Sequence, residues 1–97
     1  MQINTLGSRI TITGHIKAMS DYQDIKNAVE RITATNQAVT IEIKDSISIT
    51  SSVIGFLNKL VLKDNIKLTM IVGEDSLMNL LDELNLTQTF NAVRANR

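Results

Sequence analysis

Strand-like and helix-like hydrophobic patterns alternate along this chain, and this alternation restricts the fold more than any other feature of the sequence. Residues 9–13 and 38–43 alternate between polar and apolar side chains, which is typical of half-buried strands. Residues 67–72 are almost continuously apolar, as in a strand covered on both faces. Apolar residues recur at helical spacing in residues 20–34, 53–62 and 77–84. Strands that alternate with such helices predict an α/β fold with right-handed parallel crossovers.

Shorter elements are expected at both ends of the chain. Residues 2–6 predict a first strand, and Gly7-Ser8 suits a two-residue type II′ turn into the next strand. Residues 86–93 predict a last short strand or turn around Phe90, and residues 95–97 a frayed tail. We therefore expect one domain, residues 1–97, with a mixed sheet of four to five strands, an N-terminal β-hairpin and three helices packed on the sheet.

Hydroxyl residues gather where the second helix is expected to begin. Ser20 and Gln23 have capping-box spacing before the first helix, whereas Thr50, Ser51 and Ser52 offer three consecutive N-cap candidates. Backbone N–H groups at a helix N-terminus favour an anion, so a phosphoryl group on one of these serines would be tolerated there. The local sequence leaves open that all three residues are simply redundant caps.

Composition excludes several functional classes. The 97 residues contain no cysteine and one histidine, His15, which removes thiolate and multi-histidine chemistry, and we expect no catalytic, metal or cofactor site. Ten basic and ten acidic residues are interspersed and aromatic residues make up 3%, so nucleic-acid binding is not expected. Neither a long apolar stretch nor a signal peptide is visible, which predicts a cytoplasmic protein without membrane insertion.

Three motifs resemble the STAS domain of bacterial anti-sigma-factor antagonists, a resemblance that covers nearly the whole chain. Residues 49–55, Ile-Thr-Ser-Ser-Val-Ile-Gly, are similar to the family motif hydrophobic-Asp-Ser-[Ser/Thr]-Gly-hydrophobic-Gly at the start of the second helix. Gly14-His15-Ile16 resembles the glycine-containing motif after the second strand. Leucines at 77, 80, 81, 84 and 86, followed by Phe90, look like the closing helix of the family and its hydrophobic tail.

The resemblance implies an α/β STAS-like fold and a non-catalytic protein-binding role. In such antagonists, a serine kinase that is also the anti-sigma factor phosphorylates the serine after the motif aspartate, and the unmodified protein binds that kinase and frees the sigma factor. By position, Ser51 is the implied phosphoacceptor and Ser52 a weaker candidate. The expected assembly is a monomer or weak dimer. The expected partner-binding residues are His15, Ile16, Lys17, Met19, Thr50, Ser52, Val53, Gly55, Asn58 and Lys59.

Two alternatives remain open at this point. Thr50 stands where the motif has aspartate, Val53 where it has glycine, and Lys17 where the family usually has an acid. These departures favour a scaffolding STAS subunit that is never phosphorylated and docks constitutively on another complex, such as a transporter ATPase. The other alternative is a small-molecule-binding or enzymatic domain that holds an anion at the N-terminus of the second helix.

Overall fold

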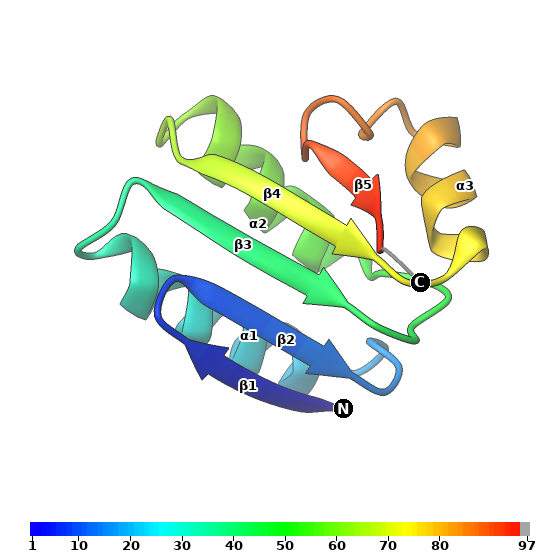
Figure 1. Cartoon of the computed structure of the whole chain (residues 1–97), viewed down its shortest axis with the longest axis horizontal. Coiled ribbons are helices and arrows are strands. Elements are labelled where there is room, and N and C mark those ends of the chain that lie inside the picture. The colour runs from blue at the N-terminus through cyan, green and yellow to red at the C-terminus, as the bar shows by residue number, and fades with distance from the viewer. Residues whose placement is uncertain (96–97) are drawn as a thin grey trace.

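A computed structural model describes residues 1–95 and shows an α/β fold with a mixed five-stranded sheet (Figure 1). The predicted order of elements is confirmed, whereas residues 96 and 97 of the expected tail lie outside the described residues. The elements are β1 (Gln2–Leu6), β2 (Arg9–Thr13), α1 (Met19–Thr33), β3 (Ala38–Ile43), α2 (Ser51–Leu62), β4 (Lys67–Val72), α3 (Asp75–Glu83) and β5 (Ala92–Arg94).

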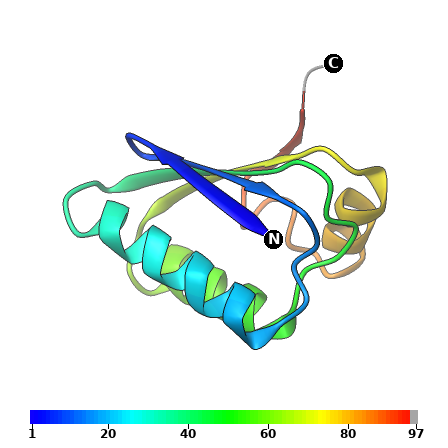
Figure 2. The ribbon, with the colours of Figure 1, turned by 90° about the horizontal axis from the view of Figure 1, so that it is seen from below.

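The strands lie side by side in the order in which they occur in the chain, β1-β2-β3-β4-β5. β1 and β2 form the expected antiparallel hairpin, in which Gly7 has the positive φ of 60° that the first position of a type II′ turn requires. The other neighbours are parallel. Because each right-handed crossover advances in the same direction along the sheet, all three helices lie on one face (Figure 2).

One face of the sheet is therefore free of helices, which corrects the expectation for residues 67–72. In β4, Leu68, Met70 and Val72 are buried under the helices, whereas Thr69 and Ile71 on the other face are only half-buried. The apolar run is not a strand covered on both faces, since no crossover reverses direction to bring a helix to the second face. The core lies between the helices and the face of the sheet that they cover, around Ile10, Ile41, Leu57 and Phe90.

The helix starts differ from the sequence prediction for local reasons. α1 begins at Met19 with Ala18 as N-cap, because the Asp21 carboxylate accepts the backbone N–H groups of Lys17 (3.0 Å) and Ala18 (2.9 Å). The capping box expected at Ser20 and Gln23 is thus wrong. α2 begins at Ser51, two residues before the expected segment.

The last strand also lies later than expected. β5 covers residues 92–94, and Phe90 precedes it in a turn, fully buried in the core. Phe90 is an apolar anchor for this turn, and the chain reaches the sheet only after it.

Candidate functional site

The loops at the carboxyl ends of β2 and β3 are tied together by side chains of the β3–α2 loop. The N–H of Gly14 donates to Oδ1 of Asp45 at 2.7 Å, and the N–H of Ile16 donates to Oγ of Ser46 at 3.0 Å. Ser46 is fully buried and donates its own hydroxyl to the carbonyl of Ser48 at 2.7 Å. These bonds hold the loop before α1 against the loop before α2.

The loop after β4 is held against the same region by close backbone packing. The N–H of Gly73 donates to the carbonyl of Ile43 at 2.9 Å. A methyl group at position 73 would overlap the carbonyl oxygen of Lys44, so only glycine fits here without a shift of the backbone. The three loops thus form a fixed support for the first turn of α2.

The hydroxyl residues at the start of α2 have distinct roles. Thr50 is the N-cap, and its Oγ1 accepts the N–H of Val53 at 3.3 Å. Ser51 and Ser52 are exposed in the first helical turn, and within residues 1–95 neither side chain makes a hydrogen bond. Only Thr50 therefore acts as a cap, and the two serines are not redundant caps. They present free hydroxyl groups at a helix N-terminus.

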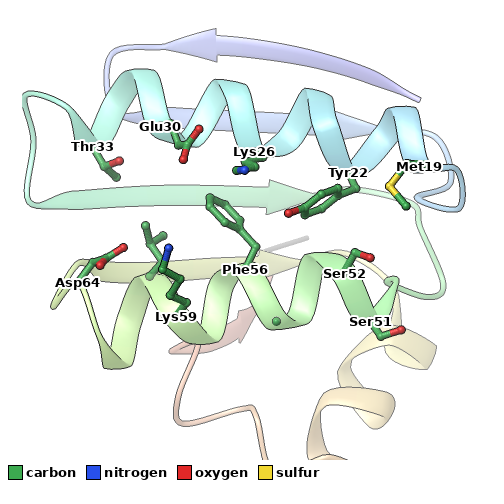
Figure 3. Close-up of a pocket in the computed structure, with 12 residues that line it drawn as sticks. Met19, Tyr22, Lys26, Glu30, Thr33, Ser51, Ser52, Phe56, Lys59 and Asp64 are labelled. Atoms are coloured by element: carbon green, nitrogen blue, oxygen red, sulfur yellow. The ribbon is translucent and has the colours of Figure 1, made fainter.

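An open groove of 510 Å³ runs between α1 and α2 and begins at these serines (Figure 3). Tyr22 of α1 and Phe56 of α2 meet edge to face, with ring centroids 6.4 Å apart, and form its apolar floor. Met19 stands at the entrance with 66% of its surface exposed. Further along, the groove is lined by the charged residues Lys26, Glu30, Lys59 and Asp64.

A smaller hollow of 150 Å³ joins the loop before α1 to the first turn of α2. Lys17 and Met19 line it on one side, and Thr50 and Ser52 on the other. The structure thus brings together four of the residues that the sequence placed in a partner surface. Lys59 and Gly55 lie on the wall of the adjoining groove.

Other sequence-predicted partner residues lie elsewhere. Ile16 and Val53 each have 1% of their surface exposed and belong to the core, so the expectation that they contact a partner is wrong. Asn58 shares a helix face with the half-buried Ile54 and Val61, and its amide oxygen is buried without a partner among residues 1–95, so its expected exposure is also corrected. His15 is exposed but lines neither hollow.

The electrostatics of the first turn of α2 favour a negative charge. The first turn contains no acidic residue, and Lys17 lies in the hollow next to Ser52. An anion here would meet the positive end of the α2 dipole and an ammonium group. The nearby carboxylate, Asp21, is held in place by the N–H groups of Ala18 and Lys17, which lower its pKa below the usual range.

The sequence prediction missed Tyr22, Lys26 and Phe56 as surface residues of the groove. Tyr22 and Phe56 fall in the apolar helical patterns of residues 20–34 and 53–62, and such patterns predict core residues. Both are only partly buried. The sequence feature that could have indicated the groove is the wide apolar surface of residues 53–62. It contains more apolar residues than a helix needs to pack on one sheet.

Within residues 1–95, no group of three or more histidine, aspartate and glutamate side chains is placed to hold a metal ion. In the same part of the chain, no helix has the length and apolar character needed to cross a membrane. Comparisons with protein-family models, with curated proteins and with solved structures give no match.

Proposed function

We propose that this chain is a STAS-like, non-catalytic binding module of a bacterial partner-switching pathway and acts in the cytoplasm. Its partner is a serine kinase that also serves as an anti-sigma factor. The unmodified chain binds the kinase, and phosphorylation of Ser51 releases it.

One observation carries this proposal. Two exposed serine hydroxyls, which make no hydrogen bond within residues 1–95, lie with the exposed Met19 at the open end of the groove that Tyr22 and Phe56 also line. A partner that covers Met19 and enters the groove must also cover Ser51 or Ser52. A modification of either hydroxyl therefore falls within the contact area.

The chemistry of the switch follows from the position of Ser51. Oγ of Ser51 attacks the γ-phosphorus of ATP bound to the kinase, the bond between that phosphorus and ADP breaks, and the hydroxyl proton leaves to the kinase or to water. The new phosphate carries a charge of about −1.5 to −2. The α2 dipole stabilises this charge within the chain, and Lys17 lies in the hollow that contains the adjacent Ser52. An apolar partner surface would desolvate the phosphate, which costs free energy and weakens binding.

The cap at position 50 is compatible with this role. Thr50 replaces the aspartate of the family motif, but its hydroxyl caps α2 as aspartate would. The backbone of the first turn is therefore held without the carboxylate. What changes is the charge next to Ser51.

The experiment is phosphorylation of the purified chain by its kinase from the native host, with ATP, followed by intact-mass measurement. We expect the wild-type chain to gain one phosphate, the Ser51→Ala chain to gain none, and the Ser52→Ala chain to behave as wild type. Phosphate incorporation into Ser51→Ala at the wild-type rate would contradict the assignment.

The second candidate is a scaffolding STAS subunit that is never phosphorylated and docks on another complex such as a transporter ATPase. Lys17 favours it, because a lysine next to Ser52 replaces the acid that the switch family usually has there. If the chain is such a scaffolding subunit, the protein purified from its host carries no phosphate under any growth condition. It also copurifies with the complex in stoichiometric amount.

A further inference from the structure

The two free edges of the sheet are β1 and β5, and they are protected to different extents. β5 has three residues, and its Arg94 is paired with Asp75 at 2.9 Å. A short edge strand with a charged residue resists pairing with another strand. β1 has five residues, Gln-Ile-Asn-Thr-Leu, with no charge and no proline, and it lies open along one side of the molecule (Figure 1). It has none of the usual devices that block pairing of edges.

The hydrogen-bonding groups of β1 that face outward can be assigned from the hairpin. Leu6 and Arg9 close the two-residue turn and form a hydrogen-bonded pair. Because such pairs alternate along an antiparallel ladder, Asn4 and Gln2 also face β2. The N–H and C=O groups of Ile3 and Thr5 therefore point away from the sheet. They form a regular row that another strand can join.

A groove of 470 Å³ lies below this edge, between β1 and the outer side of α1. Ile3 and Thr5 line it from the strand, and Asp24 and Arg31 line it from the helix. Both charged residues are exposed, and neither forms an ion pair within residues 1–95. They are two turns apart on one side of α1, with Asn27 and Ala28 between them.

We infer that β1 is the interface of a homodimer, in which β1 pairs in antiparallel fashion with β1 of a second copy. A two-fold axis through Asn4 places Ile3 opposite Thr5 of the other copy, so that the outward N–H and C=O groups of both strands pair. The same axis sets the two α1 helices antiparallel on one face of a continuous sheet. Asp24 of each copy then faces Arg31 of the other, as an isologous interface requires.

The register can be tested with single cysteines, because the chain has none of its own. On the two-fold axis, residue 4 of one copy opposes residue 4 of the other as a non-hydrogen-bonded pair, with Cα atoms about 4.5 Å apart. This separation is within the range for a disulfide. We expect Asn4→Cys to form a covalent dimer under mild oxidation at least tenfold faster than Gln2→Cys or Leu6→Cys. Those two controls place their thiols on the same strand face but roughly 13 Å from their symmetry mates.

The mass of the chain in solution tests the dimer itself. Light scattering over a concentration series should show wild-type chain approaching twice the monomer mass. Asp24→Arg should weaken the dimer, Arg31→Asp should do the same, and the double variant should restore it. Lys63→Asp, at the C-cap of α2, is the matched control for a charge reversal. Figure 3 shows that α2 lies on the other side of α1 from β1. A wild-type chain that stays monomeric, or equal oxidation rates for the three cysteine variants, would overturn the inference.

Discussion

Two neighbouring regions at the carboxyl ends of the parallel strands are built in opposite ways. The loops before α1 and α2 are tied by Asp45 and Ser46, and the loop after β4 is packed tightly through Gly73. The first turn of α2 instead exposes Ser51 and Ser52 without any hydrogen bond from their side chains among residues 1–95. Substitutions in the tied loops should therefore affect stability, whereas substitutions at the two exposed serines should affect binding alone.

The largest expected effect is on the tied loops. Gly73→Ala forces a methyl group into the Lys44 carbonyl oxygen, and we expect it to lower the free energy of unfolding by about 3 kcal/mol. Gly55→Ala is the matched control, because its added methyl meets no atom within 4 Å. In the interior of α2, this change should raise the free energy of unfolding by roughly 0.5–1 kcal/mol. Urea unfolding measures the free energy of unfolding of both variants. Equal changes in the two variants would contradict the difference between the tied loops and α2.

A second test removes the hydroxyl that joins two loops. Ser46→Ala leaves the buried N–H of Ile16 and the carbonyl of Ser48 without their partner, and should cost about 2 kcal/mol of unfolding free energy. Ser48→Ala, at an exposed position nearby, should change the same quantity by less than about 0.5 kcal/mol. Similar losses in the two variants would show that the Ser46 bonds do not hold the loops.

A third test uses the pH dependence of stability to ask whether the ionised Asp21 carboxylate stabilises the start of α1. Its folded-state pKa is lowered by the N–H groups of Ala18 and Lys17, so its ionised form stabilises the fold. This contribution is present above a pH of about 4, the usual carboxyl pKa, and is lost as pH falls through the folded-state pKa. Asp21→Asn should therefore have a lower Tm than wild type at pH 7, and the difference should shrink toward pH 3. A pH-independent difference in Tm would contradict this explanation of the α1 start.

The smallest expected effect on stability is at the exposed serines. Ser51→Asp places a negative charge at the N-terminus of α2 and should change the free energy of unfolding by at most about 1 kcal/mol, in the stabilising direction. Thermal unfolding measures this change. A strong loss of stability would mean that Ser51 belongs with the tied loops and is not a free surface residue.

Much of the fold was predictable because hydrophobic periodicity is a local signal. The alternation in residues 9–13 and 38–43 gives β2 and β3 at their observed bounds. The single covered face of β4 was not predictable from its own residues. It depends on the direction in which successive crossovers advance, which is a property of the whole chain.

The candidate site was predictable only in part. Its hydroxyls stand out in the sequence because Thr50, Ser51 and Ser52 are adjacent, but only the structure separates the cap from the two exposed serines. Ile16 and Val53 appear in motifs that resemble a binding surface, yet their side chains point into the core. The groove requires two helices to lie side by side, and no local pattern specifies that distance.

The most direct test of the central claim is the affinity of the kinase partner for two aspartate variants. Ser51→Asp and Ser76→Asp both place a carboxylate in the first turn of a helix, but Ser76 lies on α3 and outside the groove. We expect Ser51→Asp to weaken binding by about tenfold or more, which corresponds to about 1.4 kcal/mol, and Ser76→Asp to bind as wild type does. Equal affinities of the two variants would contradict the claim that the first turn of α2 is the switch surface.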